Sequence, residues 1–143
     1  DTLEGEIGDH PAVSSGVQAV VSYCGASNLT TILSQSTPHG LSVREPALAL
    51  FIGGHPSEVP DVARAASPVF HVDASDPPVL LIHGDQDPQM PISQSHELFG
   101  AYERQDLDAT FEVGYGAGHC TGELFTGELW GELMRFLERT IGE

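Results

Sequence analysis

The sequence predicts an α/β fold in which about three parallel strands carry flanking helices and a cap-like insertion. Short aliphatic or β-branched runs at 17–23, 79–82 and 109–113 are typical of strands. The continuous apolar run at 79–82 suits a strand buried in a parallel sheet. Helical patterns follow the last two runs, and strands that alternate with helices imply right-handed crossovers. These observations together favour one parallel sheet.

The first half of the chain is predicted to be a strand followed by a cap. The strand over 17–23 ends in a turn at Gly25. From about residue 28 to 60 the pattern loosens into polar, Gly- and Pro-rich stretches around short apolar pieces, which is typical of a mobile cap or a long loop. A helical turn over 62–66 is expected to stop before Pro68, because a residue that precedes proline is disfavoured in the α region.

The second half is predicted to alternate strand and helix. Two prolines at 77–78 break the chain before the strand at 79–82. Ser93 is the expected N-cap of a helix over 94–104, and the strand at 109–113 follows. Leucine, phenylalanine and isoleucine residues at three- and four-residue spacing predict a last helix over 124–141.

Length and charge limit the classes of protein. We expect residues 1–143 to form a single domain, because 143 residues suit one core. Five arginines and no lysine oppose 21 acidic residues, and the formal net charge of −16 repels nucleic acid and anionic lipid. The acidity fits either ordinary solubility or adaptation to high salt. No membrane-spanning run or signal peptide is visible, so the chain is expected to be soluble, with its compartment open.

Two loop motifs carry the chemistry of a hydrolytic triad. H-G-D-Q-D at 83–87 closes one strand, and G-A-G-H at 116–119 follows the next. Since parallel strands end at one edge of a sheet, Asp87 and His119 can meet there as the acid and the base of a serine hydrolase. Gly116 and Gly118 are expected to let the second loop bend back toward the first.

Other residues near these motifs have simpler interpretations. Asp85 is the alternative acid, but it more plausibly hydrogen-bonds within its own turn. His83 ends the strand and is expected to be a packed histidine, not a catalytic one. The remaining histidines lack a spacing such as H-E-x-x-H, so no metal site and no cofactor are expected. Cys24 and Cys120 read as two free thiols, with one disulfide as the alternative.

These motifs resemble the carboxyl-terminal half of the α/β-hydrolase superfamily, particularly the esterases and lipases related to bacterial carboxylesterases and feruloyl or acetylxylan esterases. The resemblance covers about residues 3–141. Residues 3–10 and 17–21 resemble the stretch that leads from the nucleophile helix into the sixth strand, and residues 66–68 resemble the return from the cap. The resemblance implies cofactor-free hydrolysis of a small-molecule carboxylic ester, with Asp87 as the triad acid and His119 as the triad base. Gln89, Met90 and Cys120 would lie near the acyl or alcohol pocket, or simply pack in their loops.

The chain lacks the G-x-S-x-G elbow and the oxyanion-hole motif that the resemblance places upstream. The serine is therefore expected upstream or on a partner chain. Ser27 is the alternative for a self-contained enzyme, although Leu29 stands where the elbow needs its second glycine. The strand at 17–23 would then have an open edge that pairs with a second copy or with the missing first half. A non-catalytic module that self-associates or binds a partner is the competing class.

Overall fold

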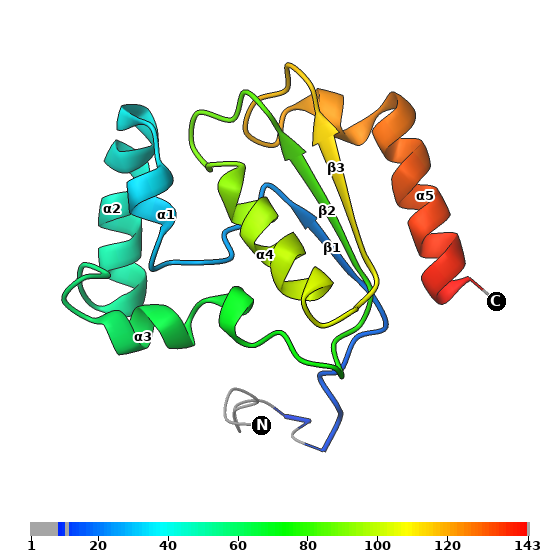
Figure 1. Cartoon of the computed structure of the whole chain (residues 1–143), viewed down its shortest axis with the longest axis horizontal. Helices are drawn as coiled ribbons and strands as arrows, with labels where there is room; N and C mark the ends of the chain where they lie inside the picture. Colours follow the sequence, from blue (N-terminus) through cyan, green and yellow to red (C-terminus); the bar gives the residue numbers. More distant parts are fainter. Residues whose placement is uncertain (1–8, 11, 143) are drawn as a thin grey trace.

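A three-stranded parallel sheet lies at the centre of the computed structural model, which describes residues 9–10 and 12–142 (Figure 1). Its order is β1-β2-β3, with Val20 opposite Val79 and Val79 opposite Ala109. The predicted α/β class and the three parallel strands are confirmed. The elements along the chain are β1 (Val20–Tyr23), α1 (Ile32–Gln35), α2 (Pro38–Ile52), α3 (Pro60–Ala65), η1 (Pro68–Phe70), β2 (Val79–Gly84), α4 (Ser93–Glu103), β3 (Ala109–Gly114), η2 (Gly122–Phe125) and α5 (Gly127–Ile141).

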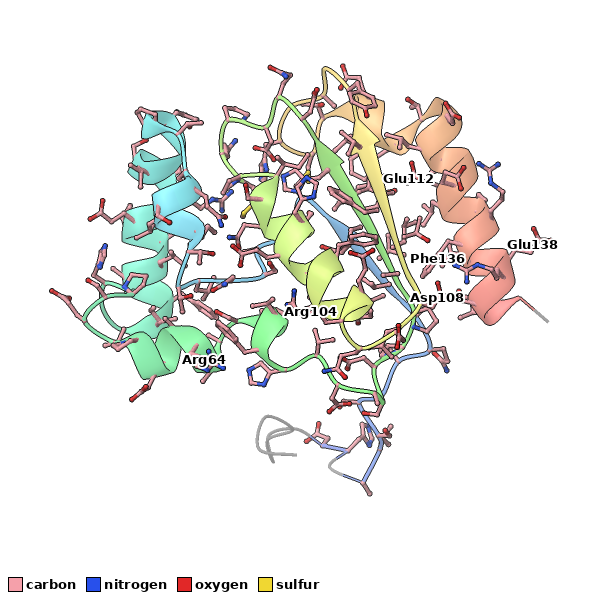
Figure 2. The ribbon with its side chains drawn as sticks, in the orientation of Figure 1. Arg64, Arg104, Asp108, Glu112, Phe136 and Glu138 are labelled. Atoms are coloured by element: carbon pink, nitrogen blue, oxygen red, sulfur yellow. The ribbon has the colours of Figure 1, made fainter. Side chains whose placement is uncertain are left out.

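Helices cover both faces of the sheet. Figure 1 shows α4 on one face and α5 on the other. Alternate residues of β2 point to opposite faces, so Leu80 and Ile82 pack with Phe136 of α5, whereas Val79 and Leu81 pack with Tyr102 of α4. In Figure 2 the Phe136 side chain lies between α5 and the sheet. The central strand is therefore buried on both sides, as its continuous apolar sequence predicts.

The first strand is shorter than predicted. It begins at Val20, and Val17 is 57% exposed. The ladder to β2 starts where the Val20 N–H donates to the Pro78 carbonyl at 2.9 Å. Because prolines at 77–78 have no N–H group, they cannot extend the ladder toward Val17. Residues Val20–Tyr23 are only half-buried, since β2 is their one neighbouring strand among the described residues.

The segment predicted as a loose cap contains a long helix, α2. Thr37 caps it by accepting a hydrogen bond from the Gly40 N–H at 3.0 Å, and Gly53 ends it with φ 83°. Of the two alternatives for residues 28–60, a long loop is wrong, because helices occupy much of the segment, whereas its role as a cap stays a prediction. Helices α1, α2 and α3 lie beside α4, away from the strands (Figure 1). Their own core consists of Leu29, Ile32, Leu48, Ile52, Ala63 and Met90.

The remaining helix boundaries differ by a few residues. Ser93 is the first residue of α4 and forms no cap, because Ile92 before it is already in the helical region. The short helix η2 precedes α5, which begins at Gly127, φ 58°, and not at residue 124. Helix α3 ends at Ala65, close to the predicted stop before Pro68. Among residues 9–10 and 12–142, no helix is long and apolar enough to cross a bilayer.

Candidate active site

The loops that follow β2 and β3 are joined by hydrogen bonds at one edge of the sheet. The Asp85 N–H donates to the Gly114 carbonyl at 3.2 Å, and the Gln86 N–H donates to the Ala117 carbonyl at 3.0 Å. The Asp85 carboxylate accepts from the Gly116 N–H at 2.6 Å. The prediction that Asp85 bonds within its own turn is therefore wrong, because the neighbouring loop offers it this backbone donor. Asp85 fastens one loop to the other.

Glycine at position 84 lets the two loops approach closely. A Cβ atom there would lie 2.3 Å from the Ala117 carbonyl oxygen, well inside any real contact. Gly116 has φ 78°, a conformation that other residues rarely adopt, as predicted. The same prediction for Gly118 is wrong, because its φ is not positive. Close approach at Gly84 and the turn at Gly116 place the loop 115–121 over the end of β2.

Asp87 and His119 meet between these loops. The His119 Nδ1 lies 2.7 Å from the Asp87 Oδ2. The Asp87 side chain is 1% exposed, whereas that of His119 is 27% exposed. The other Asp87 oxygen accepts from the N–H groups of Gln89 and Met90, each at 2.8 Å. Asp87 thus acts both in its turn and across to His119, and the turn bonds fix the carboxylate in place.

This geometry decides which imidazole nitrogen can act as a base. A carboxylate accepts hydrogen bonds, so His119 must carry its proton on Nδ1 and donate it to Asp87. The lone pair then lies on Nε2, which belongs to a partly exposed ring. A neutral imidazole in this tautomer can take a proton from a nucleophile, and Asp87 stabilises the imidazolium that forms. The catalytic roles themselves stay predictions.

His83 supports Asp87 from the buried side. The ring is fully buried, with Nδ1 2.7 Å from the Ser95 hydroxyl and Nε2 3.0 Å from the Met90 carbonyl oxygen. Nε2 also lies 3.4 Å from the Asp87 Oδ2. Burial lowers the pKa of His83, although the Met90 carbonyl and Asp87 oppose that effect. The sequence predicts a packed histidine at this position, and the burial confirms it.

The two cysteines lie beside His119. Both are free thiols, so the structure favours that prediction over the disulfide. The Cys120 N–H donates to the Cys24 Sγ at 3.1 Å, and the Cys120 thiol lies 3.5 Å from the Tyr23 carbonyl oxygen. Burial, followed by the hydrogen bond from the Cys120 side chain, raises the pKa of Cys24 to about 12. Cys24 is therefore a neutral thiol at the end of β1.

A family model described as BD-FAE matches residues 1–102, a range that includes Asp87 and ends before His119. The chain belongs to the BD-FAE family. The α/β-hydrolase resemblance is thereby confirmed. A solved truncated form of a carbohydrate esterase from gut microbiota shares 32% identity with this BD-FAE chain, at a TM-score of 0.84. That alignment covers 96% of the chain and 47% of the esterase.

Two curated proteins also match this BD-FAE chain. Dipeptidyl peptidase family member 6 of Caenorhabditis elegans is 25% identical over 125 residues, which cover 85% of the chain. Esterase LipC of Mycobacterium tuberculosis (strain ATCC 25618 / H37Rv) is 39% identical over 64 residues, which cover 42% of the chain. The matched stretches are 17% and 15% of these relatives, so the chain spans only part of their length.

The predicted substrate contacts of this BD-FAE member lie in different surroundings. Met90 is 4% exposed and packs in the core formed by the cap helices. Gln89 lines a cavity of about 200 Å³ together with Thr37 and Asp87, but His119 and Cys120 are not in its lining. The contacts of Gln89, Met90 and Cys120 with substrate stay predictions.

Ser27 does not share the Asp87–His119 site. It is 1% exposed, and its hydroxyl donates to the Gln94 carbonyl at 2.5 Å. The Gln94 side-chain oxygen also accepts from the N–H groups of residues 27 and 28. The sequence does not predict this role of Gln94, which joins α4 to the start of the cap. Gln94 lies three residues before Glu97 and therefore on the same side of α4. Glu97 in turn accepts hydrogen bonds from the side chains of Asn28 and Thr31.

Proposed function

We propose that this chain supplies the acid and the base of a carboxylic-ester hydrolase of the Ser-His-Asp type. The observation that carries the proposal is the 2.7 Å contact between the Asp87 Oδ2 and the His119 Nδ1. Membership in the BD-FAE family and the likeness to a carbohydrate esterase support an ester as the substrate. Asp87 is the acid, His119 is the base, and the chemistry needs no cofactor.

The proposed reaction uses a serine from outside these residues. Its hydroxyl attacks the ester carbonyl carbon while His119 Nε2 takes the hydroxyl proton. Collapse of the tetrahedral intermediate breaks the bond to the alcohol oxygen, and the imidazolium gives its proton to that oxygen. Water then attacks the acyl-enzyme, His119 again accepts and returns the proton, and the carboxylic acid and the free serine result. Backbone N–H groups beside the serine hold the oxyanion.

The open edge of β1 is the proposed site of contact with the polypeptide that carries the serine. Its residues are half-buried, and one row of backbone groups faces no strand among the residues that the structure describes. The chain covers 47% of the carbohydrate esterase, which favours a missing first half over a second copy of this chain as the occupant of that edge. That half lies upstream in the same polypeptide or on a partner chain.

Ester-hydrolysis kinetics test this proposal, measured on the protein expressed from the reading frame extended upstream of Asp1. We expect p-nitrophenyl acetate hydrolysis to fall about 10⁴-fold in Asp87→Asn and at least as far in His119→Ala, because the first loses the correct tautomer and the second loses the base. His39→Ala is the matched control, since His39 is exposed on α2. Equal rates in wild type and His119→Ala would reject the proposal and leave the non-catalytic module.

Covalent labelling distinguishes the candidate nucleophiles. A fluorophosphonate probe should label an upstream serine of the extended protein and leave the 143-residue chain unlabelled. Labelling of the short chain that disappears in Ser27→Ala would show a self-contained enzyme instead. Sedimentation of the short chain tests the edge, because a stable, well-folded monomer would contradict the need for a partner at β1.

A further inference from the structure

Cys24, His119 and Cys120 form a cluster with the donor set of a metal site. One side-chain ligand atom from each of these residues lies within 4.8 Å of the ligand atoms of the other two. Cys24 follows the last residue of β1, whereas the other two belong to the loop after β3. We propose that this cluster binds a thiophilic divalent metal ion, of which Zn²⁺ is the commonest in proteins.

The donors and their spacing suit Zn²⁺. Zinc takes thiolate sulfur at about 2.3 Å and imidazole nitrogen at about 2.0 Å in tetrahedral geometry, so two sulfurs on one ion lie about 3.8 Å apart. The cluster needs a contraction of no more than about 1 Å to reach that separation. Cys24 is buried, but Cys120 and His119 are partly exposed, so an ion can enter from their side. Two sulfurs and one nitrogen leave a fourth position for water.

Two hydrogen bonds hold His119 and Cys24 in states that favour binding of the ion. Asp87 holds the Nδ1–H of His119, and a carboxylate behind a ligating histidine is the usual arrangement in zinc sites, because it fixes the ring and raises the basicity of the other nitrogen. Because Nδ1 carries the proton given to Asp87, the proposed ion would bind through Nε2. The Cys120 N–H, which lies 3.1 Å from the Cys24 sulfur, would stabilise the thiolate that metal binding creates. The ion replaces the thiol protons, which pass to solvent.

The position of the cluster gives it a consequence for activity. A metal ion on Nε2 takes the lone pair that the base needs, so the occupied site cannot accept a proton from serine. This inhibitory effect rests on the proposed function, whereas metal binding does not. The formal charge of −16 also raises the local concentration of divalent cations near the chain. Under the two proposals together, a nucleophile and a metal ion compete for the same nitrogen of His119.

Titration of the reduced 143-residue chain with Co²⁺ and then Zn²⁺ tests metal binding directly. We expect one Co²⁺ per chain, with thiolate-to-metal charge-transfer bands and the intense visible bands of tetrahedral Co²⁺, both abolished by Zn²⁺. Cys120→Ser and Cys24→Ser should weaken Zn²⁺ binding by about 100-fold, and Asp87→Asn by about tenfold, since Asp87 only orients a ligand. His39→Gln is the control for histidines outside the cluster.

Each alternative result has a defined meaning. Six-coordinate Co²⁺ spectra without charge transfer, or equal Zn²⁺ affinity in wild type and Cys120→Ser, would overturn the proposal. Unchanged affinity in Asp87→Asn would also overturn it, because thiols in an unfolded chain would not depend on Asp87. Tetrahedral Co²⁺ bands in a protein whose extended form lacks esterase activity would remove the proposed function and leave the metal site in place.

Discussion

Replacing Gly84 with alanine is expected to separate Asp87 from His119. The new Cβ would lie 2.3 Å from the Ala117 carbonyl oxygen, and real Cβ atoms essentially never come closer than 3.0 Å to such an atom. Because the obstacle is backbone and not the end of a flexible side chain, the loop 115–121 has to move by about 1 Å. The 2.7 Å contact between the carboxylate and the imidazole then exceeds the range of a strong hydrogen bond.

The size of the effect follows from two terms. Overpacking in a closed site costs about 1–3 kcal/mol. The shift also weakens the hydrogen bond from the Gln86 N–H to the Ala117 carbonyl, worth about 0.5–1.5 kcal/mol. Gly84→Ala should therefore lower the free energy of unfolding by about 1.5–4.5 kcal/mol. If the proposed function holds, the same displacement of the base lowers kcat/KM about 100-fold.

Urea denaturation and proton NMR of the His119 ring measure the two consequences separately. Gly122→Ala is the matched control, because no atom lies within 4 Å of its added Cβ and its φ is not positive. We expect the downfield Nδ1–H resonance of His119 to persist in the control and to be lost in Gly84→Ala. An unchanged resonance together with unchanged stability in Gly84→Ala would refute the close-approach argument.

Two further substitutions test the cap and the acidic surface. Gln94→Met should lower the free energy of unfolding in urea by about 2–5 kcal/mol relative to the exposed Gln105→Met, because the backbone N–H groups at 27–28 lose their acceptor. A cost equal to that of the control would contradict this role. Burial and then the charges of neighbouring α5 glutamates raise the pKa of Glu112, which Figure 2 shows between β3 and α5. The ionised form is thus disfavoured in the folded state, so Glu112→Gln should stabilise the chain by a few tenths of a kcal/mol at pH 7, unlike the exposed Glu138→Gln. The gain in stability should vanish as the pH falls below about 4, where the carboxyl is protonated in both the folded and the unfolded state. A gain that increased at lower pH would contradict the raised pKa of Glu112.

The strands and the position of the site could be predicted from local sequence patterns. A four-residue aliphatic run between a proline pair and a polar loop has few alternatives to a buried strand, and β2 occupies Val79–Gly84. Helix α2 could not be predicted in this way. Pro46 lies inside this helix, and Leu50 and Phe51 on it are 87% and 72% exposed. Its apolar residues therefore form no single stripe, which is the signal that helix prediction uses.

Contacts between loops were less predictable than the loops themselves. Asp85 and Asp87 are both acidic residues of one turn, and sequence alone offers a turn role for either. The structure assigns the turn bonds to Asp87 and the cross-loop bond to Asp85, in addition to the contact between Asp87 and His119. Which N–H group meets which carboxylate depends on how two loops approach in space, and that approach depends on Gly84.

The contact between Asp87 and His119 forms within the part of the fold that this chain contains. The hydrogen bonds between the two loops run between residues 83–90 and 113–120. Cys120 also ties the second loop to the end of β1, through the Tyr23 carbonyl and the Cys24 sulfur. Under the proposed function, the polypeptide that carries the serine therefore does not have to build the Asp87–His119 contact. On that proposal, a strand of this polypeptide pairs with β1 and brings a serine to the exposed side of His119. Residues 20–24 join β1 to β2. If the proposed function holds, pairing along β1 and hydrolysis at the loops after β2 and β3 can be tested by different substitutions. A variant at β1 should reduce the fraction of assembled enzyme, and Gly84→Ala should reduce the rate of the enzyme that has assembled.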